Sequence, residues 1–303
     1  MRIVIALGGN AILQRGQMLT AENQRLNVRK AVEQLSPLID AGHQIVLTHG
    51  SGPQIGLLSL QNFAYKPNQM YPLDVLDAEV SGMIGYVIGQ ELYNARSDHP
   101  QIATLLTQIE VDWDDPAFET PSKPIGPFMQ KAEAERLSAQ YNWQIVEDKG
   151  QWRRVVASPF PRRVIEADII RMMVKNGIIV ICAGGGGVPV VRDQNGDLIG
   201  IEAVIDKDHA SALVAKNVNA DQLLLLTDVE GVYENWGADD QCLVAEMNPV
   251  DADASRYPAG SMGPKIAAAS SFGKISGKSA VIGSINYIPE ILAGKSGTHF
   301  KLN

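Results

Sequence analysis

The sequence has few cysteines, no excess of positive charge and no long apolar run, and each shortage excludes a class of protein. Its 303 residues include two cysteines, Cys182 and Cys242, which are too few for a disulfide-stabilised scaffold or a cysteine-rich metal centre. No apolar run approaches the roughly 20 residues that a membrane-spanning helix needs. The formal net charge of −8 argues against a general surface for nucleic acid or anionic membrane, because both favour basic proteins.

The beginning of the chain also lacks the layout of a signal peptide. Met1 and Arg2 lead directly into a strand-like run rather than into a basic segment followed by a longer apolar stretch. We therefore expect a cytoplasmic protein that binds small molecules and neither nucleic acid nor membrane.

Three common site motifs are absent as well. The loop after His49 lacks the Gly-x-Ser-x-Gly pattern of a nucleophile elbow. Neither a Walker phosphate loop nor a Gly-x-Gly-x-x-Gly dinucleotide fingerprint occurs in the right context. These absences disfavour a serine hydrolase, a P-loop nucleotidase and a nicotinamide-dependent dehydrogenase.

Four apolar runs each end in a polar loop that contains glycine. The loops are Gly8–Asn10, Thr48–Gln54, Ala183–Pro189 and Thr227–Tyr233. An unbroken aliphatic run is typical of a strand buried on both faces of a parallel sheet, and the carboxyl ends of parallel strands share one edge, where ligands bind. A tight turn explains any one of these loops, but together they predict an α/β fold with an anion-binding edge.

The stretch 112–161 interrupts this α/β pattern. It is polar and aromatic, contains several prolines and has one helical pattern near 131–141. A segment of this length is too long for a loop without structure of its own. We expect a small inserted subdomain that acts as a lid.

Other local signals predict individual elements. Thr20 is placed to cap a helix that continues to Ile39, and Asn195-Gly196 predicts a hairpin. The spacing also predicts a long helix over Leu73–Leu92. Gly82, Gly85 and Gly89 recur along that helix, which favours close packing in the core or at a dimer interface over contact with a ligand.

Three lysines have unusual neighbours. Lys123 lies between Ser122 and Pro124, Lys207 lies between two aspartates, and Lys265 follows a Gly-Pro pair at a helix start. Phosphoryl transfer needs positive charge near the oxygens of the moving group, and loss of one preorganised donor typically costs about 3 to 4 kcal/mol of barrier. A solvated side chain is the commoner role of a lysine, and Asp206–Asp208 could be only a helix cap with a local ion pair.

These motifs resemble the carbamate kinase family, a branch of the amino acid kinase superfamily, over nearly the whole chain. The stretches that carry the similarity are Ala6–Ala11, Thr48–Gln54, Ser122–Pro127, Trp152–Val156, Gly184–Pro189, Val204–Asp208 and Gly260–Lys265. The resemblance implies a single domain over 1–303, built as an open αβα sandwich around a mainly parallel sheet, with 112–161 as the lid. It also implies a homodimer that catalyses ATP + carbamate ⇌ ADP + carbamoyl phosphate, with Mg²⁺ on the nucleotide phosphates and no metal ligand from the protein.

The resemblance also assigns roles to residues of this chain. Lys123 would reach in from the lid, Lys207 and Lys265 would neutralise phosphate oxygens, and Asp208 would orient the lysines. The N-terminal part would hold the acceptor, and the residues around the transferred phosphoryl group would be Gly8, Gly9, Asn10, Gly50, Ser51 and Gly52. The nucleotide would bind to the part at about 206–303, against Thr227, Asp228, Tyr233, Met262 and Gly263.

One stretch departs from the family pattern. Where the family usually reads Gly-Ala-x-Ser-Gln-Gly, this chain has Asp77–Gly82, with Val80 and Ser81 in place of the Ser-Gln pair. The departure leaves the choice of acceptor and the dimer contact open. Besides a carbamate kinase that runs toward ATP synthesis, two alternatives therefore stand: a related kinase for another small carboxylate, and a non-catalytic regulatory protein that binds nucleotide.

Overall fold

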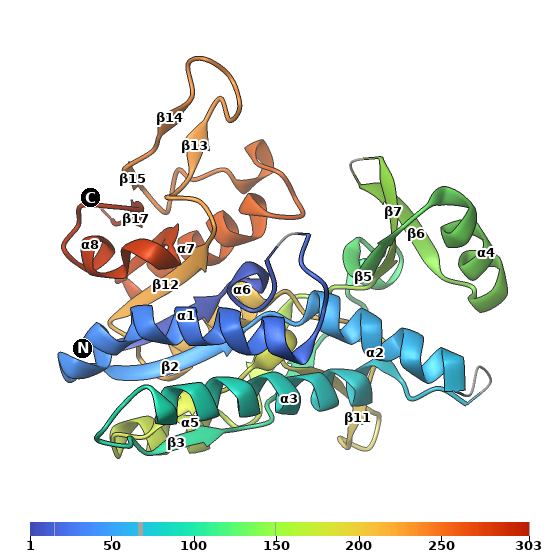
Figure 1. The fold of residues 1–303 in the computed structure, drawn as a ribbon, viewed down its shortest axis with the longest axis horizontal. Helices are drawn as coiled ribbons and strands as arrows, with labels where there is room; N and C mark the ends of the chain where they lie inside the picture. The colour runs from blue at the N-terminus through green and yellow to red at the C-terminus, as the bar shows by residue number, and fades with distance from the viewer. Residues whose placement is uncertain (15, 66–68, 149, 303) are drawn as a thin grey trace.

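A mainly parallel eight-stranded sheet forms the centre of the computed structural model, which describes residues 1–14, 16–65, 69–148 and 150–302 apart from the side chain of Asn10 (Figure 1). The strand order is β15-β17-β16-β12-β1-β2-β9-β3. The strands are β1 (Arg2–Leu7), β2 (Gln44–His49), β3 (Ile102–Thr104), β9 (Ile179–Ile181), β12 (Gln222–Thr227), β15 (Glu246–Met247), β16 (Ser279–Ser284) and β17 (Thr298–Phe300). Every described pairing in this sheet is parallel except that of β16 with β17.

Helices cover both faces of the sheet, because successive side chains of a strand point to opposite sides. On β1, Ile3, Ile5 and Leu7 pack into one core with α1 (Ala21–Asp40), α3 (Leu73–Asn94) and α8 (Ile288–Leu292). Val4 and Ala6 pack into a second core with α5 (Ala167–Lys175), α6 (Lys207–Asn217) and α7 (Met262–Ser276). The predicted αβα sandwich is confirmed.

The two helices predicted on the first face are also present. Thr20 caps α1, since its Oγ1 accepts a hydrogen bond from Asn23 N at 3.2 Å. On α3, a Cβ added to Gly85 would lie 2.4 Å from Cγ2 of Thr104 in β3, whereas one added to Gly82 would meet nothing within 4 Å. Gly85 therefore serves close packing of the helix on the sheet.

A second sheet lies beside the first. It contains β4 (Gln108–Val111), β8 (Pro161–Val164), β10 (Val188–Arg192) and β11 (Leu198–Gly200), in the order β11-β10-β4-β8. Strands β10 and β11 form the predicted hairpin, and Gly196 in its turn has a φ of +86°, a left-handed conformation that glycine adopts readily.

A small subdomain projects beside α2 (Gly52–Tyr65) and is drawn in green in Figure 1. Its antiparallel sheet has the order β5-β7-β6 and consists of β5 (Lys123–Met129), β6 (Gln144–Asp148) and β7 (Gln151–Val156), with α4 (Lys131–Tyr141) packed on it. Met129, Leu137 and Trp143 form a separate apolar cluster with Phe63 of α2. This subdomain lies within the predicted range 112–161, and its action as a lid stays a prediction.

The attachment of the subdomain to α2 is a contact between two backbones. A Cβ added to Gly56 of α2 would lie 1.8 Å from Cα of Gly126 in β5, and Gly126 has a φ of +74°. No other residue type fits at Gly56 without displacing β5.

The remaining elements are short. A hairpin of β13 (Tyr233–Glu234) and β14 (Cys242–Leu243) extends above the main sheet in Figure 1. The 3-10 turns are η1 (Gly9–Ala11), η2 (Pro116–Phe118), η3 (Gly184–Gly186), η4 (Ala254–Arg256) and η5 (Ile285–Tyr287). Within the described ranges, none of the helices has both the length and the apolar character required to span a lipid bilayer.

Candidate active site

The four loops that contain glycine meet at the carboxyl edge of the main sheet. A Cβ added to Gly8 would lie 2.9 Å from the carbonyl oxygen of Leu226 at the end of β12, and one added to Gly50 would lie 3.7 Å from Gly9 N. A Cβ added to Gly185 would lie 2.6 Å from Ser51 Oγ. The loops after β1, β2, β9 and β12 are therefore in contact, as their positions in a parallel sheet predict.

Three helices begin at the same edge. Helix α2 starts at Gly52, α6 at Lys207 and α7 at Met262. The first N–H groups of a helix have no partner within it and carry partial positive charge. The edge therefore offers several donors to an anion.

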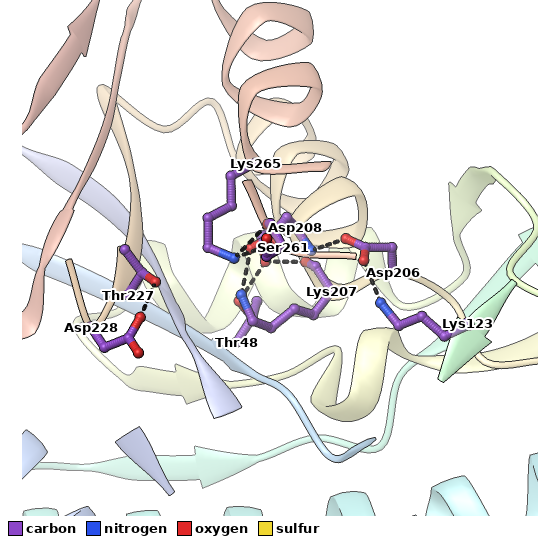
Figure 2. A network of polar contacts seen from close by, with 10 residues as sticks. Thr48, Lys123, Asp206, Lys207, Asp208, Thr227, Asp228, Ser261 and Lys265 are labelled. Carbon is purple, nitrogen blue, oxygen red and sulfur yellow. Dashed lines mark hydrogen bonds and ion pairs between the residues drawn. The ribbon is translucent and has the colours of Figure 1, made fainter. Parts of the chain in front are cut away.

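Two of the predicted lysines share one buried aspartate (Figure 2). Lys207 Nζ forms an ion pair with Oδ1 of Asp208, and Lys265 Nζ donates to Oδ2 of Asp208 at 3.1 Å. Lys265 Nζ also donates to the carbonyl oxygen of Ser261 at 3.4 Å. Asp208 thus holds both ammonium groups in place; its role in orienting them toward phosphate stays a prediction.

The first turn of α6 is fixed to its surroundings from several sides. Asp206 caps the helix by accepting a hydrogen bond from Asp208 N at 2.9 Å. Ser211 Oγ donates to the carbonyl of Lys207 and lies 2.6 Å from Thr48 Oγ1 of β2. The stem of Lys207 passes over Gly50, where an added Cβ would lie 3.3 Å from Cδ of the lysine.

The charges in this cluster shift one another's protonation. Burial alone would raise the pKa of Asp208, but the positive charges of the two lysines outweigh this effect, so its pKa lies below the ordinary value. For Lys207 the effect of burial prevails and lowers the pKa, although Asp208 opposes it. For Lys265 burial also lowers the pKa, but the charge and hydrogen bond of Asp208 outweigh it, so the pKa is raised.

The third lysine reaches the edge from the small subdomain. Lys123 begins β5, and its Nζ forms an ion pair with Oδ2 of Asp206 at the start of α6 (Figure 2). Burial alone would raise the pKa of Asp206, but Lys123 and His209 outweigh this effect, so its pKa lies well below the usual range. The structure therefore joins all three lysines through Asp206 and Asp208.

The loop after β2, which is predicted to hold the acceptor, contacts both α3 and the start of β5. Ser51 is buried, and its Oγ donates to Oδ1 of Asp77 at 3.4 Å. A Cβ added to Gly52 would lie 3.9 Å from the carbonyl oxygen of Pro124, next to Lys123. The backbone of Asn10 belongs to η1, while its side chain lies outside the described part of the chain.

Most of the predicted nucleotide residues lie on the other side of Lys265. Thr227 ends β12, and its Oγ1 donates to Asp228 Oδ1 at 3.1 Å. Asp228 contributes to the raised pKa of Lys265, and Figure 2 shows both residues beside that lysine. Met262 and Gly263 open α7 in the turn that precedes Lys265.

Tyr233, also predicted to line the nucleotide site, lies farther along the loop after β12, and its role there stays a prediction. It lies in β13, where its ring packs edge-on against Trp236 with 5.1 Å between the ring centroids. Burial raises the pKa of the Tyr233 hydroxyl, and the nearby Glu230 raises it as well. Tyr233 therefore belongs to the hairpin of β13 and β14.

Sequence reasoning did not single out several residues of this edge. Asp206 was considered only as a helix cap with a local ion pair, and no local signal connects it with Lys123, because 83 positions separate the two residues. His49 was considered only as a hydrolase residue; it is buried, and burial lowers its pKa to about 4. Asp77 was noted only as part of a departure from the family pattern, although a charged residue on the apolar face of a helix is itself a signal.

A nucleotide site of this kind implies Mg²⁺, which can be compared with the side chains present. In the described part of the chain, no group of three or more His, Cys, Asp or Glu side chains is arranged to hold a metal ion. The two acids nearest the lysines, Asp206 and Asp208, are already paired with them. These residues fit an ion carried on phosphate oxygens and water, and not a site built from protein carboxylates.

Comparison with known proteins agrees with this geometry. Residues 1–284 match the model of the amino acid kinase family. The chain is 51% identical over 298 residues to a carbamate kinase of Haemophilus influenzae, covering 98% of this chain and 96% of that protein. It is 49% identical to a carbamate kinase of Escherichia coli, covering 99% of each.

Among solved structures, the carbamate kinase of Giardia lamblia bound to AMP-PNP superposes with a TM-score of 0.90. It is 38% identical in sequence, and the match covers 100% of this chain and 98% of that one. The chain therefore belongs to the amino acid kinase family, and within that family to the carbamate kinases.

Proposed function

We propose that this protein catalyses the reversible reaction ATP + carbamate ⇌ ADP + carbamoyl phosphate and that it runs toward ATP synthesis. The observation that carries the proposal is the cluster of Lys123, Lys207 and Lys265, which come from three separate elements and are joined by two aspartates at the edge of the sheet. Relatives about half identical to this chain over nearly its full length are named carbamate kinases.

The two substrates approach the cluster from opposite sides. The nucleotide binds beside Thr227, Asp228 and the start of α7, so that its terminal phosphate reaches Lys265. Carbamate binds beside the loops at Gly9 and Gly50–Gly52. Lys207, whose stem lies on Gly50, is between them and can contact the transferred group in both the substrate and the product.

The transfer is direct and in line. A carbamate oxygen attacks the γ-phosphorus while the bond from that phosphorus to the β–γ bridging oxygen breaks, and ADP leaves. Lys207 and Lys265 neutralise the equatorial and leaving oxygens, and Lys123 approaches from the lid. Because positioning and charge suffice, no residue of the protein becomes phosphorylated.

Magnesium fits this scheme as an ion bound to the nucleotide. When bound, it would supply positive charge to the phosphates. The chain's own contribution is to hold the ammonium groups and the N-terminal amides of α2, α6 and α7 around the same phosphates. Asp208 keeps the two buried lysines in position and is not itself needed as a metal ligand.

The direct test is ATP formation from carbamoyl phosphate and MgADP, followed with a coupled enzyme assay. We expect ATP from carbamoyl phosphate and little from acetyl phosphate or other acyl phosphates. Equal or better use of another acyl phosphate would favour the alternative acceptor that the Val80-Ser81 departure leaves open. Nucleotide binding without turnover of any acyl phosphate would indicate the regulatory alternative.

We also propose that the protein is a cytoplasmic homodimer. A kinase of this type uses adenine nucleotides, which the cytoplasm supplies. On α3, Met83, Tyr86 and Tyr93 are large side chains of which 42% to 55% is exposed, and such clusters often mark protein–protein contacts. Light scattering coupled to gel filtration tests the dimer, and Tyr86→Glu together with Met83→Glu should shift the mass to that of a monomer.

A further inference from the structure

Asp77 of α3 is a fully buried carboxyl group directly behind the acceptor loops. Its exposed fraction is 0%. Its Oδ1 accepts a hydrogen bond from Ser51 Oγ at 3.4 Å, and a Cβ added to Gly185 would lie 2.2 Å from the same oxygen. Asp77 thus lies between the Ser51 loop and the turn η3, which both border the proposed carbamate site.

The other oxygen of Asp77 has no partner. Oδ2 is buried and forms no hydrogen bond with any described residue, and no lysine or arginine of the described chain pairs with Asp77. A buried polar atom without a partner is costly, and such atoms in native proteins commonly face a ligand or water. Oδ2 therefore lies in the protein interior behind the acceptor loops, without a hydrogen bond that would stabilise a negative charge on it.

The charged and titratable groups around Asp77 do not stabilise a negative charge there. On the same helix, the negative charge of Asp74 disfavours ionisation of Asp77. From β2, His49 lies against Gly184 and is neutral near pH 7, since burial lowers its pKa to about 4. Glu202, from the segment after β11, accepts a hydrogen bond from Leu73 N at the start of α3.

More distant cations are occupied elsewhere. From α1, Arg25 and Arg29 pair with Glu91, far along α3 from Asp77. From α6, Lys207 pairs with Asp208. Burial, and secondarily Asp74, raise the pKa of Asp77 to about 8, against the opposing hydrogen bond from Ser51. Near pH 7 the group is therefore a neutral acid, able to donate through Oδ2.

We propose that Asp77 is a positioning residue of the acceptor site, which holds the Ser51 loop and the turn η3 for an anionic substrate while it is neutral and opposes that substrate once it is ionised. This inference rests on the proposed function and adds a regulation of the same site. Proton loss places a negative charge behind the carbamoyl group in a medium of low polarity. Binding of carbamoyl phosphate should therefore weaken as the pH rises, while turnover of the bound substrate changes little.

The experiment measures KM for carbamoyl phosphate and kcat from about pH 6.5 to 9.5, with saturating MgADP. For the wild type we expect KM to rise above about pH 8 by up to tenfold per pH unit, with kcat within about threefold. Asp77→Asn keeps the shape of the side chain and cannot ionise, so its KM should stay flat. Glu79→Gln, on the same helix and outside the site, should keep the rise of the wild type.

A second measurement uses the wild type without turnover. Calorimetry in two buffers of different ionisation enthalpy measures how many protons the protein takes up when it binds carbamoyl phosphate. At about pH 8.5 we expect uptake of a fraction of a proton. Asp77→Asn should take up less, because ionisation of the substrate itself is common to both proteins. This comparison also removes any contribution of the substrate to the KM profile.

The outcomes separate this inference from the proposed function. If the wild type makes no ATP from carbamoyl phosphate at any pH, the proposed function is wrong. If it makes ATP but its KM is flat to pH 9.5, or rises identically in Asp77→Asn, only the role of Asp77 is overturned. If Asp77→Asn fails to fold, the wild type alone tests the role of Asp77: a rise of KM above about pH 8 together with proton uptake on binding supports it, and the absence of either overturns it.

Discussion

At the scale of single residues, Asp208 is the group on which the site depends. It accepts hydrogen bonds from Lys207 and Lys265 with its two oxygens and is almost completely buried, with 4% of its side chain exposed. Each ammonium group alone would be costly at this depth. The shared carboxylate makes two adjacent cations tolerable and leaves their remaining protons for phosphate oxygens.

Lys207→Ala should nearly abolish turnover. In the proposed mechanism Lys207 contacts the transferred group throughout the reaction, and removal of one such donor typically lowers kcat by a factor of about 10² to 10³. ATP formation from carbamoyl phosphate and MgADP measures the loss. Lys216→Ala, an exposed lysine in the last turn of the same helix, is the matched control and should behave as the wild type. Unchanged activity in Lys207→Ala would refute its assigned role.

Asp208→Asn should destabilise the free protein more than the complex. The substitution leaves two buried cations without their anion, and breaking a buried ion pair costs about 3 to 5 kcal/mol. Bound phosphates supply the missing negative charge. We expect a lower Tm than the wild type, together with a larger rise of Tm on addition of MgADP and carbamoyl phosphate. Equal rises in the two proteins would show that Asp208 does not compensate the lysines.

At the scale of elements, the contact between α2 and β5 determines where the small subdomain can lie. Gly56 and Gly126 bring the two backbones together without side chains, close to the start of β5, where Lys123 reaches Asp206. A change at α2 is therefore transmitted to the position of Lys123. The same helix begins with Gly52 of the predicted acceptor loop, so α2 connects that loop with the small subdomain.

Gly56→Ala and Gly82→Ala form a matched pair for this contact. Alanine favours a helix over glycine by about 1 kcal/mol, so Gly82→Ala, with no atom within 4 Å of the new Cβ, should raise the free energy of unfolding slightly. Gly56→Ala should instead lower it by about 1 to 3 kcal/mol and should reduce kcat, because β5 must move. Urea denaturation and the ATP assay measure both effects. Stabilisation by Gly56→Ala would contradict the contact.

At the scale of the whole molecule, two buried groups make stability depend on pH in opposite directions. Asp77 has its pKa raised from 3.8 to about 8, so between these values the folded chain retains a proton that the unfolded chain has lost. His49 has its pKa lowered from 6.5 to about 4, so between these values the unfolded chain carries the extra proton. As the pH rises, the first effect lowers the free energy of unfolding and the second raises it.

The two slopes oppose each other from about pH 4 to 6.5, and from there to about pH 8 only Asp77 of these two groups still differs between the folded and unfolded chain. In that upper window we expect the free energy of unfolding to fall by about 2 kcal/mol, since one proton changes it by about 1.4 kcal/mol per pH unit. Chemical denaturation at a series of pH values measures the fall. Asp77→Asn should remove it, and a fall of the same size in that variant would assign it to other groups.

The sequence allowed the architecture to be predicted wherever the signal was local. The aliphatic run Ile3–Leu7 and the glycines that follow it predict a buried strand with a ligand-binding end, because both features arise within ten residues. The Thr20 cap and the Asn195-Gly196 turn are equally local, and both are confirmed.

What the sequence could not provide are contacts that only tertiary packing creates. Lys123 and Asp206 meet across 83 positions, and Gly56 and Gly126 look like ordinary glycines until α2 and β5 are in place. The burial of Asp77 likewise depends on Ser51 and Gly185, which approach it from two other parts of the chain. The contact of Tyr233 with Trp236 in the β13 hairpin is likewise visible only in the folded chain.

The pairing of each site lysine with an aspartate has a consequence for the small ions that surround the protein. Three ammonium groups and two carboxylates leave a net charge of +1 in the cluster, and each carboxylate is tethered at a high effective concentration. Chloride, with a single charge, competes poorly against such an internal counterion. A polyanion that touches several lysines at once replaces more than one of these contacts, so we expect the cluster to favour polyphosphates over abundant monovalent salts.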